Sequence, residues 1–226
     1  MCGRYALHGP ASRIREQFDL GDGFDFEPRY NIAPTMKALV VHPGRHGERV
    51  ASTCRWGLIP SWAKDPTIGA RLINARAETV AAKPAFRTAF RRWRCLLPAS
   101  GFYEWQRVEQ DGRTIRQPYF IRPQDAGDLF GFAGLGERWM SPAGEEVMTC
   151  CIITTEANGL LLPIHDRMPV ILQRSDYATW LDPGNADVHG LRALLRPADG
   201  EQMMAYAVCR AVNSSRADSP AFVDPL

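Results

Sequence analysis

Lysine is nearly absent from this chain. Of its 27 basic residues only three are lysines, and the other 24 are arginines. Arginine presents a planar fork that matches the oxygens of a phosphate group, and it stacks on bases and aromatic rings, so the bias suits a nucleic acid partner. A GC-rich genome favours arginine codons and explains the same bias without any function. The formal net charge of +2 does not decide between the two interpretations.

Long apolar runs are also missing. The 226-residue sequence has no stretch of about 18 apolar residues, which excludes a predicted transmembrane helix. Residues 1–7 lack the basic start and the apolar core of a signal peptide. We therefore expect a cytoplasmic protein without a membrane partner.

Cysteine pairs with a metal-binding spacing are absent as well. None of the six cysteines stands in a C-x-x-C pair, so we expect no metal site and no cofactor. Five stand in apolar, strand-like stretches, which is typical of buried free thiols in a cytosolic protein: Cys54, Cys95, Cys150, Cys151 and Cys209. Cys2 differs, because nothing upstream remains to cover it once Met1 is removed.

Short strand-like runs outnumber helical patterns. Strands are predicted over residues 38–42, 50–56, 95–97, 101–108, 118–122, 129–135, 147–155, 169–173 and 205–208, and helices over 12–18, 77–90, 175–181 and 188–195. The helices do not alternate regularly with the strands, which argues against a doubly wound parallel sheet. No linker or repeat divides the chain. We predict an α+β fold in a single domain, 1–226, whose mainly antiparallel sheet forms a barrel-like core with peripheral helices.

Cys2 has a reactive form if Met1 is removed. An α-amine and a thiol then stand on adjacent carbons, with ordinary pKa values of about 7.7–8.0 and 8.5, so part of each is nucleophilic at neutral pH. Such a pair suits an aldehyde: the amine forms a Schiff base, and the thiol closes a five-membered thiazolidine ring. The alternative is an incidental cysteine at a mobile terminus.

Two polar residues stand in otherwise apolar segments. Asn74 follows two apolar residues, and it either caps a helix or is an amide that positions a reacting group. Glu104 lies among three aromatic residues in the segment 101–105. Burial there raises the pKa of a carboxyl group and suits general acid–base chemistry. The alternative for Glu104 is a salt-bridged residue at a sheet edge.

The segment 163–169 is the strongest internal candidate for a site. It is a predicted loop that holds His165, Asp166 and Arg167 together before a strand. Histidine is the side chain best suited to move protons near pH 7, and arginine can hold a phosphate. A purely structural histidine is the alternative.

Aromatic residues beside cations mark two further loops, 29–35 and 56–64, which are typical of stacking platforms for single strands. The basic run 86–94 follows later, and there we interpret Arg91 and Arg92 as a solvated helix face.

The ordered segments resemble one family. C-G-R-Y, R-Y-N-I-A-P, R-W-G-L-I-P-S-W, N-A-R-A-E, G-F-Y-E-W and H-D-R-M-P resemble the SOS response-associated peptidase family, also called abasic-site processing proteins. The resemblance runs from Cys2 to about Trp180 and resumes at 209–213, whereas 182–204 matches weakly.

The resemblance implies a protein of DNA repair and the SOS response. It implies binding to single-stranded DNA with an abasic site and a covalent thiazolidine link through the N-terminal cysteine, which shields the lesion from strand breakage, with possible lyase activity. It implies these roles: Cys2 as nucleophile, Asn74 as orienting group, Glu104 and His165 as acid–base pair, Arg4, Arg76 and Arg167 on phosphates, and Asn31, Pro34 and Trp62 along the path of the bases. Ala63 stands where some relatives have a second tryptophan, so one stacking contact is missing from the pattern.

Two other functions stay open. A thiol peptidase or autoprotease would use Cys2 and His165 with Asn74 or Glu104, and it would remove Met1 itself. A module that only binds single strands would use the tryptophan and arginine loops. In each case we expect a monomer, because no heptad or large apolar helix face is visible. A DNA-bound form would be associated with the nucleoid.

Overall fold

Five strands close into a barrel at the centre of the computed structural model, which describes residues 2–24, 26–125 and 128–226. The ring follows the pairing order β3–β4–β10–β9–β6 and returns to β3. Only the β4–β10 contact within this ring is parallel. The strands are β3 (Lys37–Pro43), β4 (Arg49–Trp56), β6 (Arg94–Ala99), β9 (Phe130–Met140) and β10 (Glu146–Glu156).

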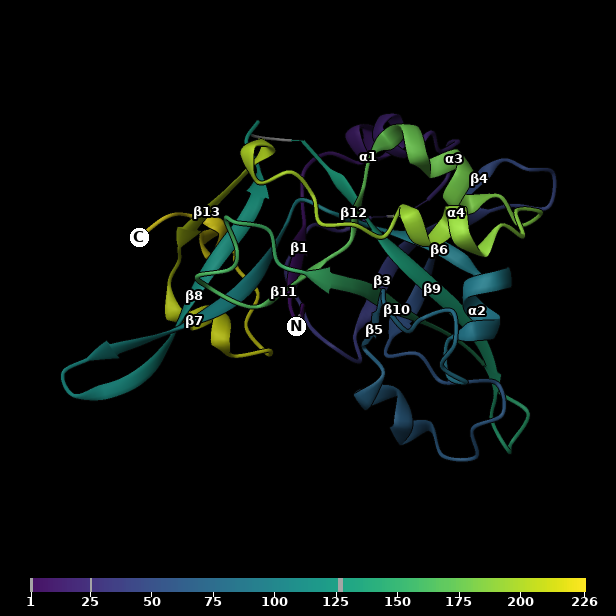
Figure 1. The fold of residues 1–226 in the computed structure, drawn as a ribbon, viewed down its shortest axis with the longest axis horizontal. Coiled ribbons are helices and arrows are strands. Elements are labelled where there is room, and N and C mark those ends of the chain that lie inside the picture. The colour runs from purple at the N-terminus through teal and green to yellow at the C-terminus, as the bar shows by residue number, and fades with distance from the viewer. Residues whose placement is uncertain (1, 25, 126–127) are drawn as a thin grey trace.

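A second sheet lies beside the barrel, to its left in Figure 1. Its order is β13–β8–β7–β1–β2, and every pairing in it is antiparallel. The strands are β1 (Tyr5–Leu7), β2 (Arg29–Ile32), β7 (Gly101–Gln110), β8 (Arg113–Pro123) and β13 (Met203–Ala207). The first strand of the chain is therefore enclosed between β2 and β7.

Three short strands extend the barrel sheet. β5 (Asn74–Arg76) runs parallel to β10, and β11 (Arg167–Pro169) runs antiparallel to β10. β12 (Ile171–Leu172) pairs with β9. Because Arg76 faces Thr154 and Arg167 faces Glu156 in these registers, β10 brings together two segments that lie far apart in the sequence.

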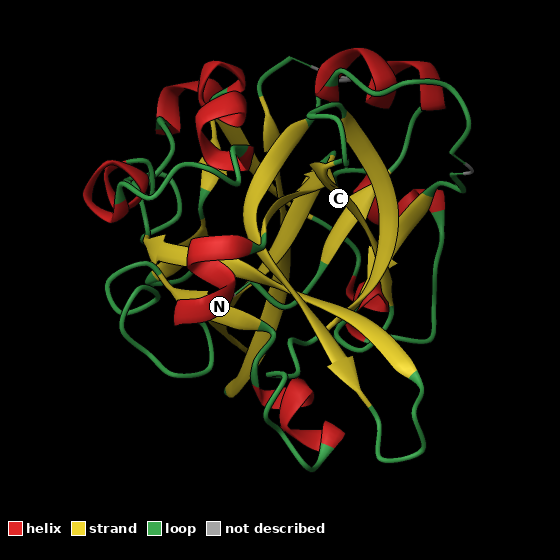
Figure 2. Cartoon of the chain, turned by 90° about the vertical axis from the view of Figure 1, so that its right-hand side faces the viewer, coloured by secondary structure: helices red, strands yellow, loops and turns green. Residues whose placement is uncertain are grey.

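The helices are short and lie around the strands, as Figure 2 shows. They are α1 (Ala11–Phe18), α2 (Arg87–Arg92), α3 (Tyr177–Leu181) and α4 (Val188–Ala193), with 3-10 turns η1 (Pro66–Arg71), η2 (Arg174–Asp176), η3 (Gly200–Gln202), η4 (Arg210–Asn213) and η5 (Pro220–Val223). Within the described residues, no helix is long and apolar enough to cross a membrane. The predicted α+β fold with a barrel-like, mainly antiparallel core is confirmed.

Several local predictions are wrong. Only a short helix, α2, forms at the end of the segment predicted to be helical over 77–90. Pro84 has no backbone N–H to donate, and the residues from Arg76 to Lys83 form separate hydrogen-bonded turns. The residues 74–76 pair with β10, so Asn74 caps no helix. The helix predicted over 175–181 begins only at Tyr177, and Ser175 lies inside η2. Part of the predicted loop 29–35 is strand β2.

Apolar side chains fill the barrel. Tyr5 packs edge-on against Trp56 and Phe132, with ring centroids 5.4 and 5.8 Å apart. All six cysteines are free thiols, and the four on barrel strands are buried as predicted. Cys209 is only half-buried, because it stands after β13 at the start of the C-terminal tail.

Arg94 is a buried cation that holds three segments together. It is 3% exposed, and its guanidinium donates only to backbone carbonyls. The bond from Nε to Trp180 O is 2.7 Å, and that from Nη1 to Phe90 O is 2.8 Å. The other acceptors are the carbonyls of Arg91, Asp182 and Asn185.

Arg94→Met is expected to lower the free energy of unfolding by about 3–5 kcal/mol, because each buried carbonyl left without a donor costs about 1–3 kcal/mol. Urea unfolding measures the difference. Arg92→Met, at the exposed end of the preceding helix α2, is the control and should change stability by less than about 0.5 kcal/mol. Equal losses in both variants would contradict the assigned role.

Candidate active site

Cys2 lies beside Glu104 at the start of β1. Tyr5 faces Phe102, and the Tyr103 N–H donates to Arg4 O at 2.9 Å, so the continued register places Gly3 opposite Glu104. Cys2 is 0% exposed in the chain that carries Met1, so the expectation of an exposed terminus is wrong for this form.

Burial raises the pKa of the Cys2 thiol well above its ordinary value, and the nearby charge of Glu104 adds to this effect. The thiol therefore stays protonated at neutral pH. While Met1 is attached, the Cys2 nitrogen is a peptide nitrogen rather than an amine. The residue is held in place but is not yet nucleophilic.

Asn74 holds the backbone of Cys2. Its Nδ2 donates to Cys2 O at 2.7 Å, from β5 on the barrel. The Asn74 Oδ1 is buried and accepts no hydrogen bond within the described chain. Since an unsatisfied buried acceptor costs free energy, this oxygen is ready to accept a hydrogen bond from a ligand donor.

Glu104 is a buried carboxyl group, 2% exposed, on β7. Desolvation raises its pKa to about 7, and the negative charge of Asp166 acts in the same direction. The alternative of a sheet-edge glutamate is excluded, because β7 lies between β1 and β8. Near neutral pH, Glu104 exists in comparable amounts as acid and base, which is the condition for proton transfer in both directions.

His165 stands on the loop before β11. The Arg167 N–H donates to His165 Nδ1 at 3.0 Å, and Asp166 Oδ1 lies 2.9 Å from the same nitrogen. A single nitrogen cannot accept from the first and donate to the second. Burial lowers the pKa of His165, so we favour the neutral ring, in which Nδ1 accepts and Nε2 carries the proton.

The loop of His165 is tied to the strand of Glu104. Gln106 Nε2 donates to Pro163 O at 3.0 Å, and the charge of Asp166 acts on the pKa of Glu104. The predicted residues Cys2, Asn74, Glu104 and His165 thus come from four separate segments that the two sheets bring together.

The three predicted phosphate-binding arginines differ in their surroundings. Arg167 makes a two-bond ion pair with Glu78, with Nη1–Oε1 at 2.7 Å and Nη2–Oε2 at 3.1 Å. Its Nη2 also donates to Thr154 O at 2.7 Å. The hydrogen bond from Arg167 lowers the pKa of Glu78. Arg76 is exposed on β5.

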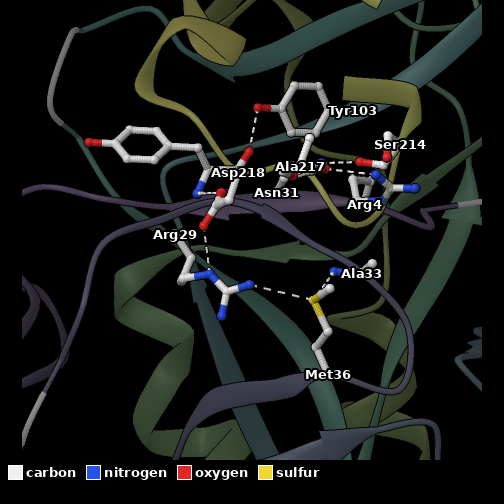
Figure 3. A network of polar contacts seen from close by, with 10 residues as sticks. Arg4, Arg29, Asn31, Ala33, Met36, Tyr103, Ser214, Ala217 and Asp218 are labelled. Atoms are coloured by element: carbon white, nitrogen blue, oxygen red, sulfur yellow. Dashed lines mark hydrogen bonds and ion pairs between the residues drawn. The ribbon is translucent and has the colours of Figure 1, made fainter. Parts of the chain in front are cut away.

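Arg4 is half-buried, and its Nη1 donates to Asn31 Oδ1 at 2.7 Å (Figure 3). The same nitrogen donates to Val212 O at 2.8 Å. The Nε atoms of Arg4 and Arg167 are both buried and donate to no atom of the described chain. Arg4 and Arg167 thus each keep an N–H donor without a partner in the described chain, and a guanidinium donor suits an anionic acceptor.

The remaining predicted residues differ in their exposure to solvent. Asn31 is completely buried, so its side chain cannot contact a ligand without breaking its present bonds. Pro34 is half-buried, and Trp62 is 60% exposed. Trp139 Nε1 donates to Ala63 O at 2.7 Å and anchors the loop that presents Trp62. Trp56, in the same predicted loop, is instead a buried residue at the end of β4.

Known proteins resemble this chain in sequence. The pattern of the family described as SOS response associated peptidase (SRAP) matches residues 1–215. The chain is 43% identical to the abasic site processing protein YoqW of Bacillus subtilis (strain 168), over 99% of each chain. The chain belongs to the SRAP family.

More distant proteins are also similar to this chain in sequence or in structure. The abasic site processing protein HMCES of Xenopus tropicalis is 32% identical, over 88% of this chain and 67% of that protein. A crystal structure of a protein from Bacteroides thetaiotaomicron superposes with a TM-score of 0.85 at 26% identity, covering 100% of both chains.

Some neighbours in this SRAP site were not predicted from the sequence. Glu78 belongs to the N-A-R-A-E segment, so its spacing from Arg76 offered a signal. Residues 214–218 offered none, because the contacts of Ser214 and Ala217 with Asn31 span 183 and 186 positions. Within the described residues, no cluster of three histidine, cysteine or acidic residues is arranged to hold a metal ion.

Proposed function

We propose that this SRAP protein processes abasic sites in DNA, and that it links covalently to the abasic site of a single strand through Cys2. The observation that carries the proposal is the placement of the Cys2 backbone, which Asn74 holds at 2.7 Å beside a carboxyl group with a pKa of about 7. The names of the relatives support the lesion as substrate.

The chemistry begins after removal of Met1. A His165 ring that carries a proton on both nitrogens donates from Nε2 to the ring oxygen of the abasic sugar. The C1′ hydroxyl proton passes to water, so the sugar opens to the C1′ aldehyde and the His165 ring returns to its neutral form. The Cys2 amine adds to C1′ and forms a carbinolamine. Glu104 donates a proton to the leaving hydroxyl group, so one water departs and an imine remains.

Ring closure follows at the same carbon. The Cys2 sulfur adds to the imine carbon, the thiol proton passes to the nitrogen, and a thiazolidine results. The order is amine first and thiol second, which fits a buried thiol with a raised pKa. Because no Schiff base remains to drive β-elimination, the strand is protected, and lyase cleavage is confined to the imine stage.

The surrounding residues would hold the strand. Arg4, Arg76 and Arg167 bind phosphates beside the lesion, and Pro34 and Trp62 contact the bases. Asn31 acts from the interior rather than on the strand. The protein acts as a monomer, cytoplasmic and associated with the nucleoid while bound to DNA.

Arg76→Ala is expected to weaken non-covalent binding to single-stranded DNA and to reduce the slope of log K against log salt by about 0.7, the value for one lost phosphate contact. Fluorescence anisotropy over a salt series measures both. Arg113→Ala, at the distant tip of the β7–β8 hairpin, is the matched control. An unchanged slope in Arg76→Ala would remove this residue from the strand path.

The function is tested with the purified protein, after mass spectrometry has established whether Met1 is removed. The protein is incubated with a single strand containing one abasic site and run on a denaturing gel. We expect a one-to-one, heat-stable shift that requires Cys2. Peptide cleavage without a shift would favour the thiol peptidase, and salt-sensitive binding alone would favour a simple binding module.

A further inference from the structure

The C-terminal tail, defined here as residues 209–218, crosses the second sheet next to Arg4. Asn31 is its main attachment: Nδ2 donates to Ala217 O at 2.7 Å, to Ser214 O at 3.0 Å and, at 3.4 Å, to Val212 O. Figure 3 shows the bonds to Ala217 and Ser214 close to the Arg4 guanidinium. A single buried amide therefore fixes the tail at three points.

The same amide also fixes Arg4. Asn31 Oδ1 accepts from Arg4 Nη1 at 2.7 Å, and Val212 O accepts from that nitrogen at 2.8 Å. The guanidinium also lies over the ring of Trp105, 5.8 Å from its centroid, and Trp105 Nε1 donates to Asn213 Oδ1 at 2.7 Å. Each of these contacts thus connects Arg4 to the tail, either directly through Val212 or by way of Asn31 or Trp105.

The tail has a second attachment at its outer end. Asp218 pairs with Arg29 at 2.7 Å and accepts from Tyr30 N at 2.8 Å. Tyr103 in turn donates to Tyr30 O at 2.7 Å, which joins this end of the tail to β7. Asp218 bonds Arg29 and Tyr30 rather than Arg4, so the outer end of the tail can be loosened separately.

We propose that Asn31 is a positioning residue that uses the tail to orient Arg4, with Nη1 committed to the protein and the remainder of the half-buried side chain available to a phosphate of the DNA. The proposal rests on the function proposed above. It gives the buried Asn31 a role that direct contact cannot explain, and it makes residues 209–218 part of the binding site.

A double-mutant cycle tests this role. Asn31→Ala, Arg4→Ala and the double variant are compared for binding to a single strand that carries a tetrahydrofuran residue, an abasic analogue without an aldehyde. We expect Asn31→Ala to weaken binding about tenfold and to cost less than about twofold when Arg4 is already alanine. Its salt slope should fall by about 0.7, as for Arg4→Ala.

Independent losses with an unchanged salt slope would overturn the proposal, because they would mean that Asn31 serves only the fold. If Asn31→Ala does not fold, Asp218→Asn takes its place, with Asp224→Asn, an exposed residue beyond the tail, as the control. We expect about threefold weaker binding for Asp218→Asn, again only when Arg4 is present. An equal loss without Arg4, or none at all, would reject the role of the tail.

Adduct formation by the unmutated protein is measured in parallel with an aldehyde-bearing abasic site. Absence of that adduct would contradict the proposed function, whereas a normal adduct with an additive cycle would contradict only the positioning role of Asn31.

Discussion

Cys2→Ala is expected to form no heat-stable adduct with a single strand that carries an abasic site, while its non-covalent binding stays within about twofold of the unmutated protein. The reason is chemical: alanine keeps the α-amine but has no sulfur to close the ring, so any imine hydrolyses on denaturation. The denaturing gel and an anisotropy titration measure the two quantities.

Cys2→Ser separates the two steps of the reaction. It keeps the amine and a weaker nucleophile, so we expect a labile imine that borohydride reduction traps, together with strand cleavage by β-elimination. A protein with a blocked N-terminus should fail as completely as Cys2→Ala. A heat-stable adduct from Cys2→Ala would show that the thiazolidine mechanism is wrong.

Glu104→Gln is expected to slow adduct formation by about 10²–10⁴, the usual contribution of a general acid–base residue. The amide keeps the shape of the carboxyl group but cannot donate a proton to the leaving hydroxyl. Glu109→Gln, on the exposed end of the same strand, is the control and should leave the rate unchanged. Equal rates in Glu104→Gln and the unmutated protein would exclude the proposed acid.

The dependence of the adduct rate on pH follows from the pKa values of the Cys2 amine and Glu104. The rate rises as the Cys2 amine loses its proton, near its ordinary pKa of about 7.7–8.0. It falls as Glu104 loses the proton that it donates, with a pKa of about 7 because burial disfavours the carboxylate. We expect a bell-shaped dependence of the adduct rate on pH, and in Glu104→Gln the fall in rate at alkaline pH should be absent. His165→Ala should slow the opening of the sugar ring, and its rate should still fall at alkaline pH.

The sequence predicts local properties, such as burial, better than contacts between distant segments. The aromatic neighbours of Glu104 correctly indicated burial and a raised pKa, because a strand among apolar residues excludes water wherever it lies. The barrel strands were predictable for the same reason, since periodicity and apolar content are local properties.

Properties that depend on distant partners could not be predicted. The burial of Cys2 depends on β2 and β7, and the strand character of Asn74 depends on its pairing with β10. Asn31 looked like a loop residue because its partners at 212–217 lie at the other end of the chain. The pairing of Arg167 with Glu78 likewise needs the two strands that flank β10.

The enclosure of β1 sets a time limit on the maturation of this protein. Cys2 becomes buried only when β7 is available to pair with β1, and β7 ends at residue 110. At about 5–20 residues per second, a ribosome completes that strand roughly 5–20 s after it starts the chain. Because Cys2 is 0% exposed in the folded chain, we expect removal of Met1 to be faster on the nascent chain than after folding. On the function proposed above, the reactive fraction of the protein would then depend on competition between trimming and folding during synthesis.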